Sequence, residues 1–258
     1  GDPGRVEKVS SLFDSIDFRM ANREFITHTG YYKGHRITAL STGIGVGTID
    51  IVLNELDALV NINLEKRIPN NSLISLELVR IGTSGGLQEE LELGSFVLSE
   101  MACGFDGLVY FYRDGELICD KEMEQSFIQH ASWDYRRPAP YFVKSSEELF
   151  NKLYKNVFSG ITLSSPGFYG PQGRVLRLPV IDSELNNKIH SFSAKGLKIM
   201  NYEMESSALF ALSRLLGHES VTICAVIANR ISKKFIHNYE PVIENLIKYT
   251  LDCICEND

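Results

Sequence analysis

Residues 79–86 read Val79-Arg80-Ile81-Gly82-Thr83-Ser84-Gly85-Gly86, and they join an apolar run that begins at Leu73 to a glycine-rich polar segment. The aliphatic run predicts a buried strand, and the three glycines predict a sharp turn that lets the backbone approach a ligand. Arg80 offers a planar fork of donors suited to a phosphate, and Thr83 adds a hydroxyl. We therefore expect an oxyanion pocket at a strand's carboxyl end. The alternative is a buried arginine paired to a core carboxylate.

The segments before this stretch predict strands, a loop and a helix. Residues 24–32 and 35–41 read as two strands of a hairpin around Lys33-Gly34. Residues 42–47 then close the second strand and open a helix whose apolar residues recur at helical spacing. The three glycines of this loop lack the third interval of a dinucleotide-binding fingerprint. The order strand, helix, strand favours a largely parallel sheet with crossover helices.

The rest of the chain continues this alternation around one irregular segment. The expected elements are, in order, a strand at 94–101, a helix after the capping-box pair Ser145 and Glu148, a strand at 157–163, a helix at 183–194, a strand at 198–201, a helix from 206, a strand at 221–228 and a C-terminal helix. Residues 103–141 are aromatic, charged and aperiodic. We expect an insertion packed on the domain surface there, with stacking on single-stranded nucleic acid as the alternative.

Composition limits the classes of function. A length of 258 residues with 44% hydrophobic content suits one large α/β domain. A net charge of -7 without a block of Lys or Arg argues against a nucleic-acid partner. No apolar run approaches a membrane span, nothing resembles a signal peptide, and five scattered cysteines suit reduced thiols. We therefore expect a cytoplasmic protein with no membrane partner, and the isolated histidines predict no catalytic transition metal.

Two further segments carry groups suited to a ligand. Gly1–Arg5 precedes a helical pattern, so its backbone N–H groups and its arginine could cradle an anion, or it is a simple capped helix start. Glu203 and Glu205 stand ahead of another helix. Either carboxylate could accept two hydrogen bonds from vicinal hydroxyls, as on ribose, while the other caps the helix. Both could instead serve only as partners of the helix dipole.

A glycine- and proline-rich loop at 166–174 displays Phe168, Gln172 and Arg174. A phenyl ring can stack on a planar heterocycle, an amide can donate and accept, and a guanidinium can donate to a carbonyl. The loop is therefore a candidate base-recognition segment, although exposed loops often carry such residues. Arg23, ahead of the hairpin, reads from its surroundings as a solvated arginine.

Seven motifs occur in one order along the chain: Gly-Asp-Pro-x-Arg-Val at 1–6, Asn22-Arg23-Glu24-Phe25, Ser41-Thr42-Gly43-Ile44-Gly45, Arg80-Ile81-Gly82-Thr83-Ser84-Gly85, Phe168-Tyr169-x-x-Gln172-x-Arg174, Glu203-Met204-Glu205-Ser206 and Asn229-Arg230. This order resembles the nucleoside phosphorylase I family and, within it, the uridine phosphorylases. The resemblance spans nearly the whole length and is weakest over the variable insertion at 103–141. It implies a single α/β domain over 1–258, with a twisted mixed central β-sheet flanked by helices, assembled as a homodimer or a trimer of dimers.

The resemblance also implies a reaction: reversible phosphorolysis of uridine to uracil and ribose 1-phosphate, with inorganic phosphate as co-substrate and no organic cofactor. The residues that would hold phosphate are Gly1 (through its backbone), Arg5, Arg80, Thr83 and, from a neighbouring subunit, Arg23. Those that would bind ribose are Ser84, Met204 and Glu205, and those that would bind the base are Phe168, Gln172, Arg174 and Arg230. Catalysis would rest on Arg80, Glu205 and Arg174. Glu24, Ile44 and Thr48 match positions that can hold a structural potassium ion, with Thr48 in place of the usual serine.

The chemistry of the bond explains why such residues would be needed. Cleavage builds positive charge on the sugar and negative charge on the base, so an enzyme gains from phosphate beneath C1′ and donors at the base carbonyls. Three other functions stay open: a purine nucleoside phosphorylase, expected to have aspartate where Asn229 stands; a nucleosidase, which would not need the phosphate arginines; and a nucleoside-binding protein without turnover. The family's upstream strand and histidine are not in this sequence, and the order Gly170-Pro171 is unusual for it.

Overall fold

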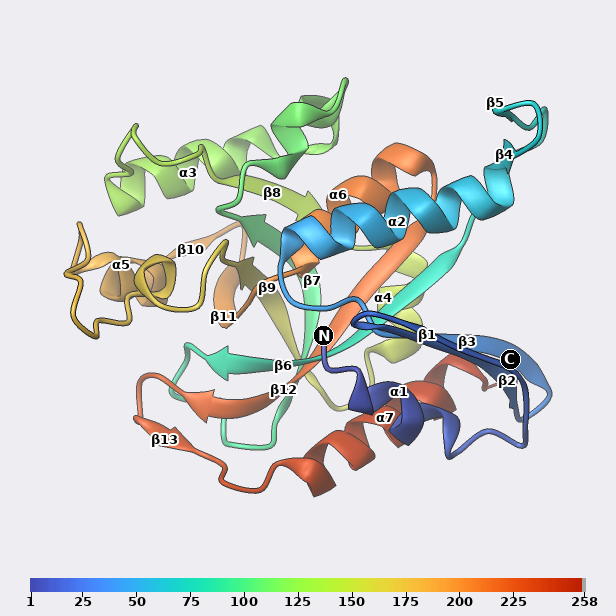
Figure 1. Cartoon of the computed structure of the whole chain (residues 1–258). Coiled ribbons are helices and arrows are strands. Elements are labelled where there is room, and N and C mark those ends of the chain that lie inside the picture. The colour runs from blue at the N-terminus through green and yellow to red at the C-terminus, as the bar shows by residue number, and fades with distance from the viewer. Residues whose placement is uncertain (257–258) are drawn as a thin grey trace.

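The computed structural model describes residues 1–256, and its centre is a mixed sheet of eight strands (Figure 1). The strands are β6 (Glu77–Gly86), β7 (Phe96–Gly104), β8 (Tyr141–Lys144), β9 (Phe158–Ser164), β10 (Ser193–Ala194), β11 (Leu197–Glu203), β12 (Glu219–Asn229) and β13 (Lys234–Phe235). They pair in the order β13-β12-β6-β11-β9-β7-β8, with β10 against β11. The expected mixed central sheet is confirmed. It also closes on itself, because β12 pairs with β7 as well as with β6.

Three strand ends meet at one edge of this sheet. β12 runs parallel to β6 along ten residue pairs, so that Asn229 lies opposite Gly86. β11 reaches the same place from the other direction, with Tyr202 paired to Gly85. The carboxyl ends of β6, β11 and β12 therefore converge, which is where ligands of α/β sheets bind.

Helices cover the sheet on both sides. They are α1 (Gly4–Ser10), α2 (Val46–Asn61), α3 (Lys121–Ala131), α4 (Glu147–Leu153), α5 (Leu185–Ser191), α6 (Ser206–Leu216) and α7 (Glu240–Ile254). α2 and α6 share one apolar cluster through Leu53 and Leu212, and α1, α4 and α7 share another through Val6, Leu153 and Leu246. Figure 1 shows α2 with α6 on one side of the sheet and α1 with α7 on the opposite side.

Two small sheets lie outside this centre. β1 (Ser15–Asn22), β2 (Phe25–Tyr32) and β3 (His35–Leu40) form an antiparallel sheet, and Tyr32 pairs with His35 around the turn. The hairpin expected around Lys33-Gly34 is thus confirmed, with both turn residues at positive φ. β4 (Ile62–Asn63) and β5 (Ile68–Pro69) make a short ribbon beyond α2.

The strand that contains residues 79–86 begins later and ends later than expected. Leu73 and Ile74 are exposed and precede the strand, whereas β6 starts at Glu77 and continues through Gly86. The expected turn at the glycines is therefore wrong. At Gly82 the missing side chain serves close packing, because a Cβ there would lie 2.5 Å from Arg80 Nη1 and 2.7 Å from Cys224 Sγ.

Residues 103–141 are not confined to the surface either. They contain two 3-10 turns and α3, and they bury Val109, Met123 and Phe127 completely. The expectation of an aperiodic surface insertion is corrected here, since Met123, Phe127 and Ala131 repeat every four residues on one face of α3. The helix expected after Ser145 is present as α4, although its N-cap is Ser146. No helix in residues 1–256 is both long and apolar enough to cross a membrane.

Candidate functional site

The guanidinium of Arg80 is the buried centre of the strand-end site. Its Nη1 lies 2.9 Å from Glu203 Oε2, and its Nη2 pairs with Glu205 Oε2. Burial opposes the charge of Arg80, but attraction to the two carboxylates outweighs burial and raises its pKa. The alternative from the sequence, a buried arginine paired to a core carboxylate, is therefore correct for the Arg80 side chain in this structure. The Nε of Arg80 is buried and has no hydrogen-bond partner within residues 1–256.

The carboxylates of Glu203 and Glu205 have different hydrogen-bond partners. The Glu203 carboxylate accepts hydrogen bonds from the backbone N–H groups of Glu205 and Ser206 at 3.0 and 3.1 Å, so it caps α6. It also accepts from the Ser164 hydroxyl. Glu205 instead accepts from the backbone N–H of Gly45 at 2.7 Å, which ties it to the loop before α2.

The charge of Glu205 is secured by these contacts. Burial by itself would raise the pKa of this carboxyl, but Arg80 and the Gly45 N–H outweigh burial and lower it. A carboxylate that stays ionised is a strong acceptor for hydroxyl groups. Met204 lies between the two glutamates and is partly buried.

Two of the residues expected to hold phosphate, Arg5 and Gly1, lie near Arg80. Arg5 donates from Nη1 to the carbonyl of Ile81 at 3.0 Å, and its Nε has no partner in the described part of the chain. Burial and the nearby charge of Arg80 lower the pKa of Arg5. Gly1 lies near the charged groups of Arg80, Arg5 and Glu205. Thr83 lies farther along β6 and is partly buried.

Arg23 is not part of this cluster within one chain. It occupies the turn between β1 and β2 with a positive φ of 55° and is exposed. Within residues 1–256 it makes no ion pair. Its expected role across a subunit interface stays a prediction.

The loop at 166–174 forms a second cluster around Gln172. Gln172 Oε1 accepts from Arg174 Nη1 at 2.5 Å and from Arg230 Nη2 at 2.6 Å, and the Gln172 carbonyl accepts from Arg230 Nη1 at 2.8 Å. Only 3% of Gln172 is exposed, so this part of the loop is not the exposed display that its composition suggested. The Arg174 guanidinium lies 3.7 Å from the centroid of the half-exposed Phe168 ring.

Two residues that the sequence analysis missed support this cluster. Asn186 on α5 donates to the Gln172 carbonyl at 3.2 Å and accepts from the Tyr202 hydroxyl at 3.3 Å. The Tyr202 ring also lies 4.8 Å from the Arg230 guanidinium. Burial and Arg174 lower the pKa of Arg230 to about 10. No motif in the sequence marks Asn186, because its role depends on a loop fourteen residues away.

The two clusters meet along β6. A Cβ on Gly85 would lie 3.4 Å from Arg230 Nε, and the Arg230 backbone N–H donates to the Gly86 carbonyl at 2.9 Å. Ser84 lies between the clusters, 6% exposed, and accepts from Asn201 Nδ2 at 2.9 Å. From Arg80 to Gly86, β6 thus leads from the cationic group past the hydroxyls of Thr83 and Ser84 to the cluster around Gln172.

Asn229 has a structural task that the sequence analysis did not foresee. Its Nδ2 donates to the carbonyls of Gln88 and Leu91 at 2.9 and 2.8 Å, and its Oδ1 accepts from the backbone N–H groups of Ile231 and Ser232. The amide is therefore occupied in holding two loops together. That a purine nucleoside phosphorylase would have aspartate at this position stays a prediction.

The positions expected to hold potassium are partly brought together. Side-chain atoms of Thr48 and Glu24 both lie near Gly43, because a Cβ there would lie 3.2 Å from Thr48 Cγ2 and 3.5 Å from Glu24 Cγ. Ile44 is 71% exposed on the same loop. Within residues 1–256 no three His, Cys, Asp or Glu side chains form a metal-binding group.

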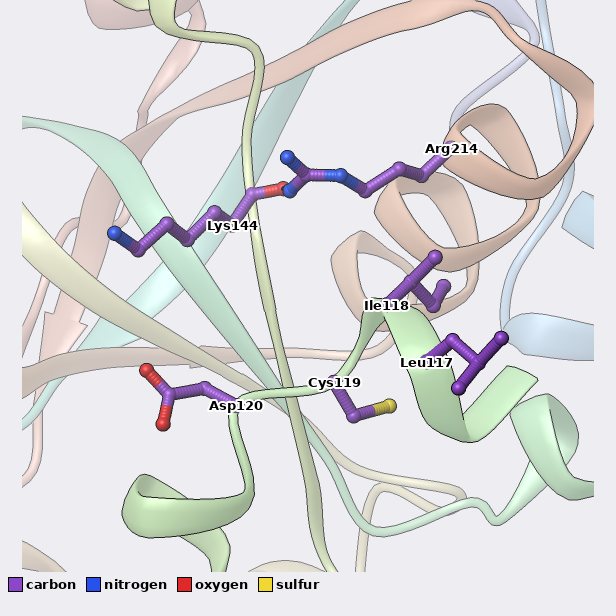
Figure 2. A pocket seen from close by; sticks show the side chains of 6 residues that line it. All are labelled: Leu117, Ile118, Cys119, Asp120, Lys144 and Arg214. Atoms are coloured by element: carbon purple, nitrogen blue, oxygen red, sulfur yellow. The ribbon is translucent and has the colours of Figure 1, made fainter. Parts of the chain in front are cut away.

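A separate hollow of about 290 Å³ lies between the 3-10 turn Gly115–Ile118, β8 and α6 (Figure 2). It is lined by Leu117, Ile118, Cys119, Asp120, Lys144 and Arg214. Figure 2 shows the Arg214 guanidinium against the backbone carbonyl of Lys144, a contact of 3.4 Å. None of the residues expected to bind phosphate, ribose or base lines this hollow, so it is distinct from the strand-end site.

Comparison with known proteins gives relatives over most of the chain. The uridine phosphorylase of Thermococcus kodakarensis is 28% identical over 235 residues, which cover 91% of this chain and 73% of that protein. A DeoD-type purine nucleoside phosphorylase of Streptococcus suis is 26% identical over 228 residues, covering 88% of this chain and 78% of that protein.

The fold also matches a solved structure. The nucleoside phosphorylase of Trypanosoma brucei, whose crystal structure is described as showing uridine phosphorylase activity, superposes with a TM-score of 0.86 at 26% identity, over 98% of this chain and 90% of that chain. A family model described as the phosphorylase superfamily matches residues 1–254. The chain belongs to the phosphorylase superfamily.

Proposed function

We propose that this protein is a uridine phosphorylase, which converts uridine and phosphate reversibly to uracil and ribose 1-phosphate. The observation that carries the proposal is the cluster in which Arg174 and Arg230 both donate to Gln172. A planar base with carbonyls on its edge suits such a cluster of donors. The uridine phosphorylase of Thermococcus kodakarensis and the Trypanosoma brucei enzyme support the same substrate.

Phosphate would bind between Arg80, Arg5, Thr83 and the backbone of Gly1. Arg80 uses Nη1 and Nη2 for the glutamates, so its unpartnered Nε–H is a donor left for an anion. The Nε–H of Arg5 is likewise buried and unpartnered within the described residues. Two such donors have a strong reason to take up an oxyanion, because a buried N–H without a partner is costly.

Ribose would lie between the phosphate and base groups. Glu205 is ionised and would accept hydrogen bonds from the vicinal hydroxyls, while Met204 packs against the sugar. The Ser84 hydroxyl would contact the nucleoside from β6. No residue needs to act as a covalent nucleophile, since phosphate itself attacks C1′.

The uracil would be read by Gln172 and Arg174, flanked by Phe168 and supported by Arg230. Because Gln172 Oε1 already accepts from two guanidiniums, its Nε2 is the part of the amide free to donate to a base carbonyl. Donors at this end stabilise the negative charge that develops on the departing base. Arg80 holds phosphate at the other end, so the two clusters act on opposite sides of the bond that breaks.

The assembly and ion belong to the same proposal. We expect a homodimer or a trimer of dimers in which Arg23 reaches the phosphate of a neighbouring subunit. Glu24, Ile44 and Thr48 would hold a structural potassium ion between subunits, and no organic cofactor would be needed. A cytoplasmic location accords with the five cysteines, all of which are free thiols in the structure.

A purine nucleoside phosphorylase is the second candidate. The Streptococcus suis relative favours it, whereas Asn229 argues against it, because a neutral amide cannot supply a proton to a purine leaving group. A phosphate-dependent assay with uridine, thymidine and inosine separates the two. We expect uridine to be cleaved far faster than inosine, and no cleavage without phosphate. Faster cleavage of inosine would replace the pyrimidine assignment by the purine one, hydrolysis without phosphate would indicate a nucleosidase, and binding without turnover a non-catalytic protein.

A further inference from the structure

A chain of buried polar side chains crosses four neighbouring strands and ends at Ser84. Ser99 on β7 contacts Thr162 on β9 at 2.5 Å, and Thr162 Oγ1 contacts Asn201 Oδ1 on β11 at 2.8 Å. Asn201 Nδ2 then lies 2.9 Å from Ser84 Oγ on β6. Ser99, Thr162 and Asn201 have no exposed surface, whereas Ser84 is 6% exposed beside the candidate site.

The hydrogen bonds of this chain can run in one of two directions. Each hydroxyl has one proton to donate, and the amide of Asn201 has a donor end and an acceptor end. If Ser99 donates to Thr162 and Thr162 to Asn201, then Asn201 donates to Ser84. The Ser84 proton is then left over. If the amide is turned over, every bond reverses and the spare proton is that of Ser99.

Burial decides between the two directions. A spare O–H on Ser99 would be sealed inside the sheet, where an unsatisfied donor is costly. A spare O–H on Ser84 belongs instead to a side chain that is 6% exposed near the carboxyl end of β6, where a ligand can accept it. The direction that ends in a donor at the site is therefore the more stable one.

We propose that Asn201 and Thr162 are positioning residues that fix the Ser84 hydroxyl as a hydrogen-bond donor to the nucleoside. They touch no substrate and act only through Ser84. The inference rests on the proposed function, and it adds two residues on β9 and β11 to the machinery for nucleoside binding. Its ligand is an oxygen acceptor of the nucleoside, since only an acceptor can use the proton that the chain leaves free.

The test is a double-mutant cycle with Thr162→Val and Ser84→Ala, measured as uridine phosphorolysis at saturating phosphate. Thr162→Val removes the donor that holds Asn201 Oδ1, so the amide is free to turn and draw the Ser84 proton away. We expect kcat/KM for uridine to fall about tenfold in Thr162→Val and to fall no further when Thr162→Val is added to Ser84→Ala. The matched control Thr162→Ser keeps the hydroxyl and should retain kcat/KM within about threefold. The phosphate KM should not change in any of these variants.

Whether the two losses add in the double mutant distinguishes a role through Ser84 from a role in the fold. Additive losses from Thr162→Val and Ser84→Ala in an active enzyme would overturn the inference, because they would mean that Thr162 acts on the fold and not through Ser84. If Thr162→Val does not fold, Asn201→Asp replaces it, since a carboxylate accepts from both Thr162 and Ser84. Its loss should likewise vanish in the Ser84→Ala background, and an additive loss there overturns the inference. A wild-type protein that does not cleave uridine overturns the proposed function and this inference with it.

Discussion

Replacing Arg80 by alanine should destabilise the protein as well as weaken phosphate binding. The Arg80 side chain is 10% exposed and pairs with Glu203 and Glu205, whose side chains are 2% and 6% exposed. Without the guanidinium, two buried carboxylates lose their counter-charge. An arginine that only contacted a ligand could be removed without harm to the fold, but Arg80 has a second task in the unliganded protein.

The size of this loss follows from the contacts that remain. Removing one partner of a buried ion pair costs about 3 to 5 kcal/mol. Glu203 keeps Ser164 and two backbone N–H groups, and Glu205 keeps the N–H of Gly45, so we expect about 3 kcal/mol, the lower end of that range. For a domain of this size each kcal/mol shifts Tm by about 2 to 4 °C, which gives a fall of about 6 to 12 °C.

The loss should also depend on pH, with a sign fixed by linkage. Once Arg80 is gone, burial raises the folded-state pKa of both carboxyls above the unfolded value of about 4.3. The variant then keeps its stability below that pH and loses it as the pH rises through the folded-state pKa. In the wild type the pKa of Glu205 is lowered, so its contribution is present above the unfolded pKa and lost as the pH falls. The gap between the two proteins should therefore widen from pH 5 to pH 8.

Thermal denaturation of wild type and Arg80→Ala at pH 5 and pH 8 measures this gap. Arg5→Ala is the matched control, because the Arg5 guanidinium donates to the carbonyl of Ile81 and forms no ion pair with a carboxylate among residues 1–256. Its loss of stability should be small and should not follow the ionisation of Glu203 and Glu205. An Arg80→Ala protein as stable as the wild type at pH 8, or a gap that is the same at both pH values, would refute the reasoning.

Three further outcomes are expected. Arg5→Ala should raise the phosphate KM by roughly tenfold to hundredfold, the equivalent of about 1.5 to 3 kcal/mol for one charge-assisted bond, and an unchanged phosphate KM would remove Arg5 from the site. Gln172→Ala should lower kcat/KM for uridine and also lower the free energy of unfolding by about 1 to 3 kcal/mol, because two guanidiniums lose a buried acceptor; urea unfolding that matches the wild type would contradict this. Mixing Arg23→Ala subunits with Arg80→Ala subunits should restore part of the activity, since a mixed dimer keeps one site without either lesion, whereas full activity of a monomeric sample would exclude a role for Arg23 across the interface.

Sequence reasoning recovered the elements whose patterns are local. The hairpin at Lys33-Gly34 and the helix after Gly45 each follow from turn chemistry or helical spacing. β1 escaped it because most of this strand is exposed and carries no alternation of buried and exposed residues. α3 escaped it because a short helix with only three core residues is hidden among aromatic and charged neighbours.

The sequence predicted which residues belong to the candidate site better than it predicted their contacts. Arg80 and Gln172 were both named from the sequence, but neither the double pairing of Arg80 nor the burial of Gln172 could be read from it. These contacts join residues more than fifty positions apart, on segments at the ends of strands whose register is set by the whole sheet. The same holds for Asn229, whose amide donates hydrogen bonds to the carbonyls of Gln88 and Leu91, and no local sequence pattern links these residues to it.

The balance of charge around Arg80 gives an independent reason to expect a subunit interface. Two buried cations, Arg80 and Arg5, stand beside two buried anions, Glu203 and Glu205, so these four side chains are close to neutral together. Phosphate adds a further negative charge near Glu205, and like charges in a buried site repel strongly. A third cation near the phosphate would offset this repulsion. Arg23 is exposed and forms no ion pair within residues 1–256, which is the condition expected of a side chain that finds its anion in another subunit.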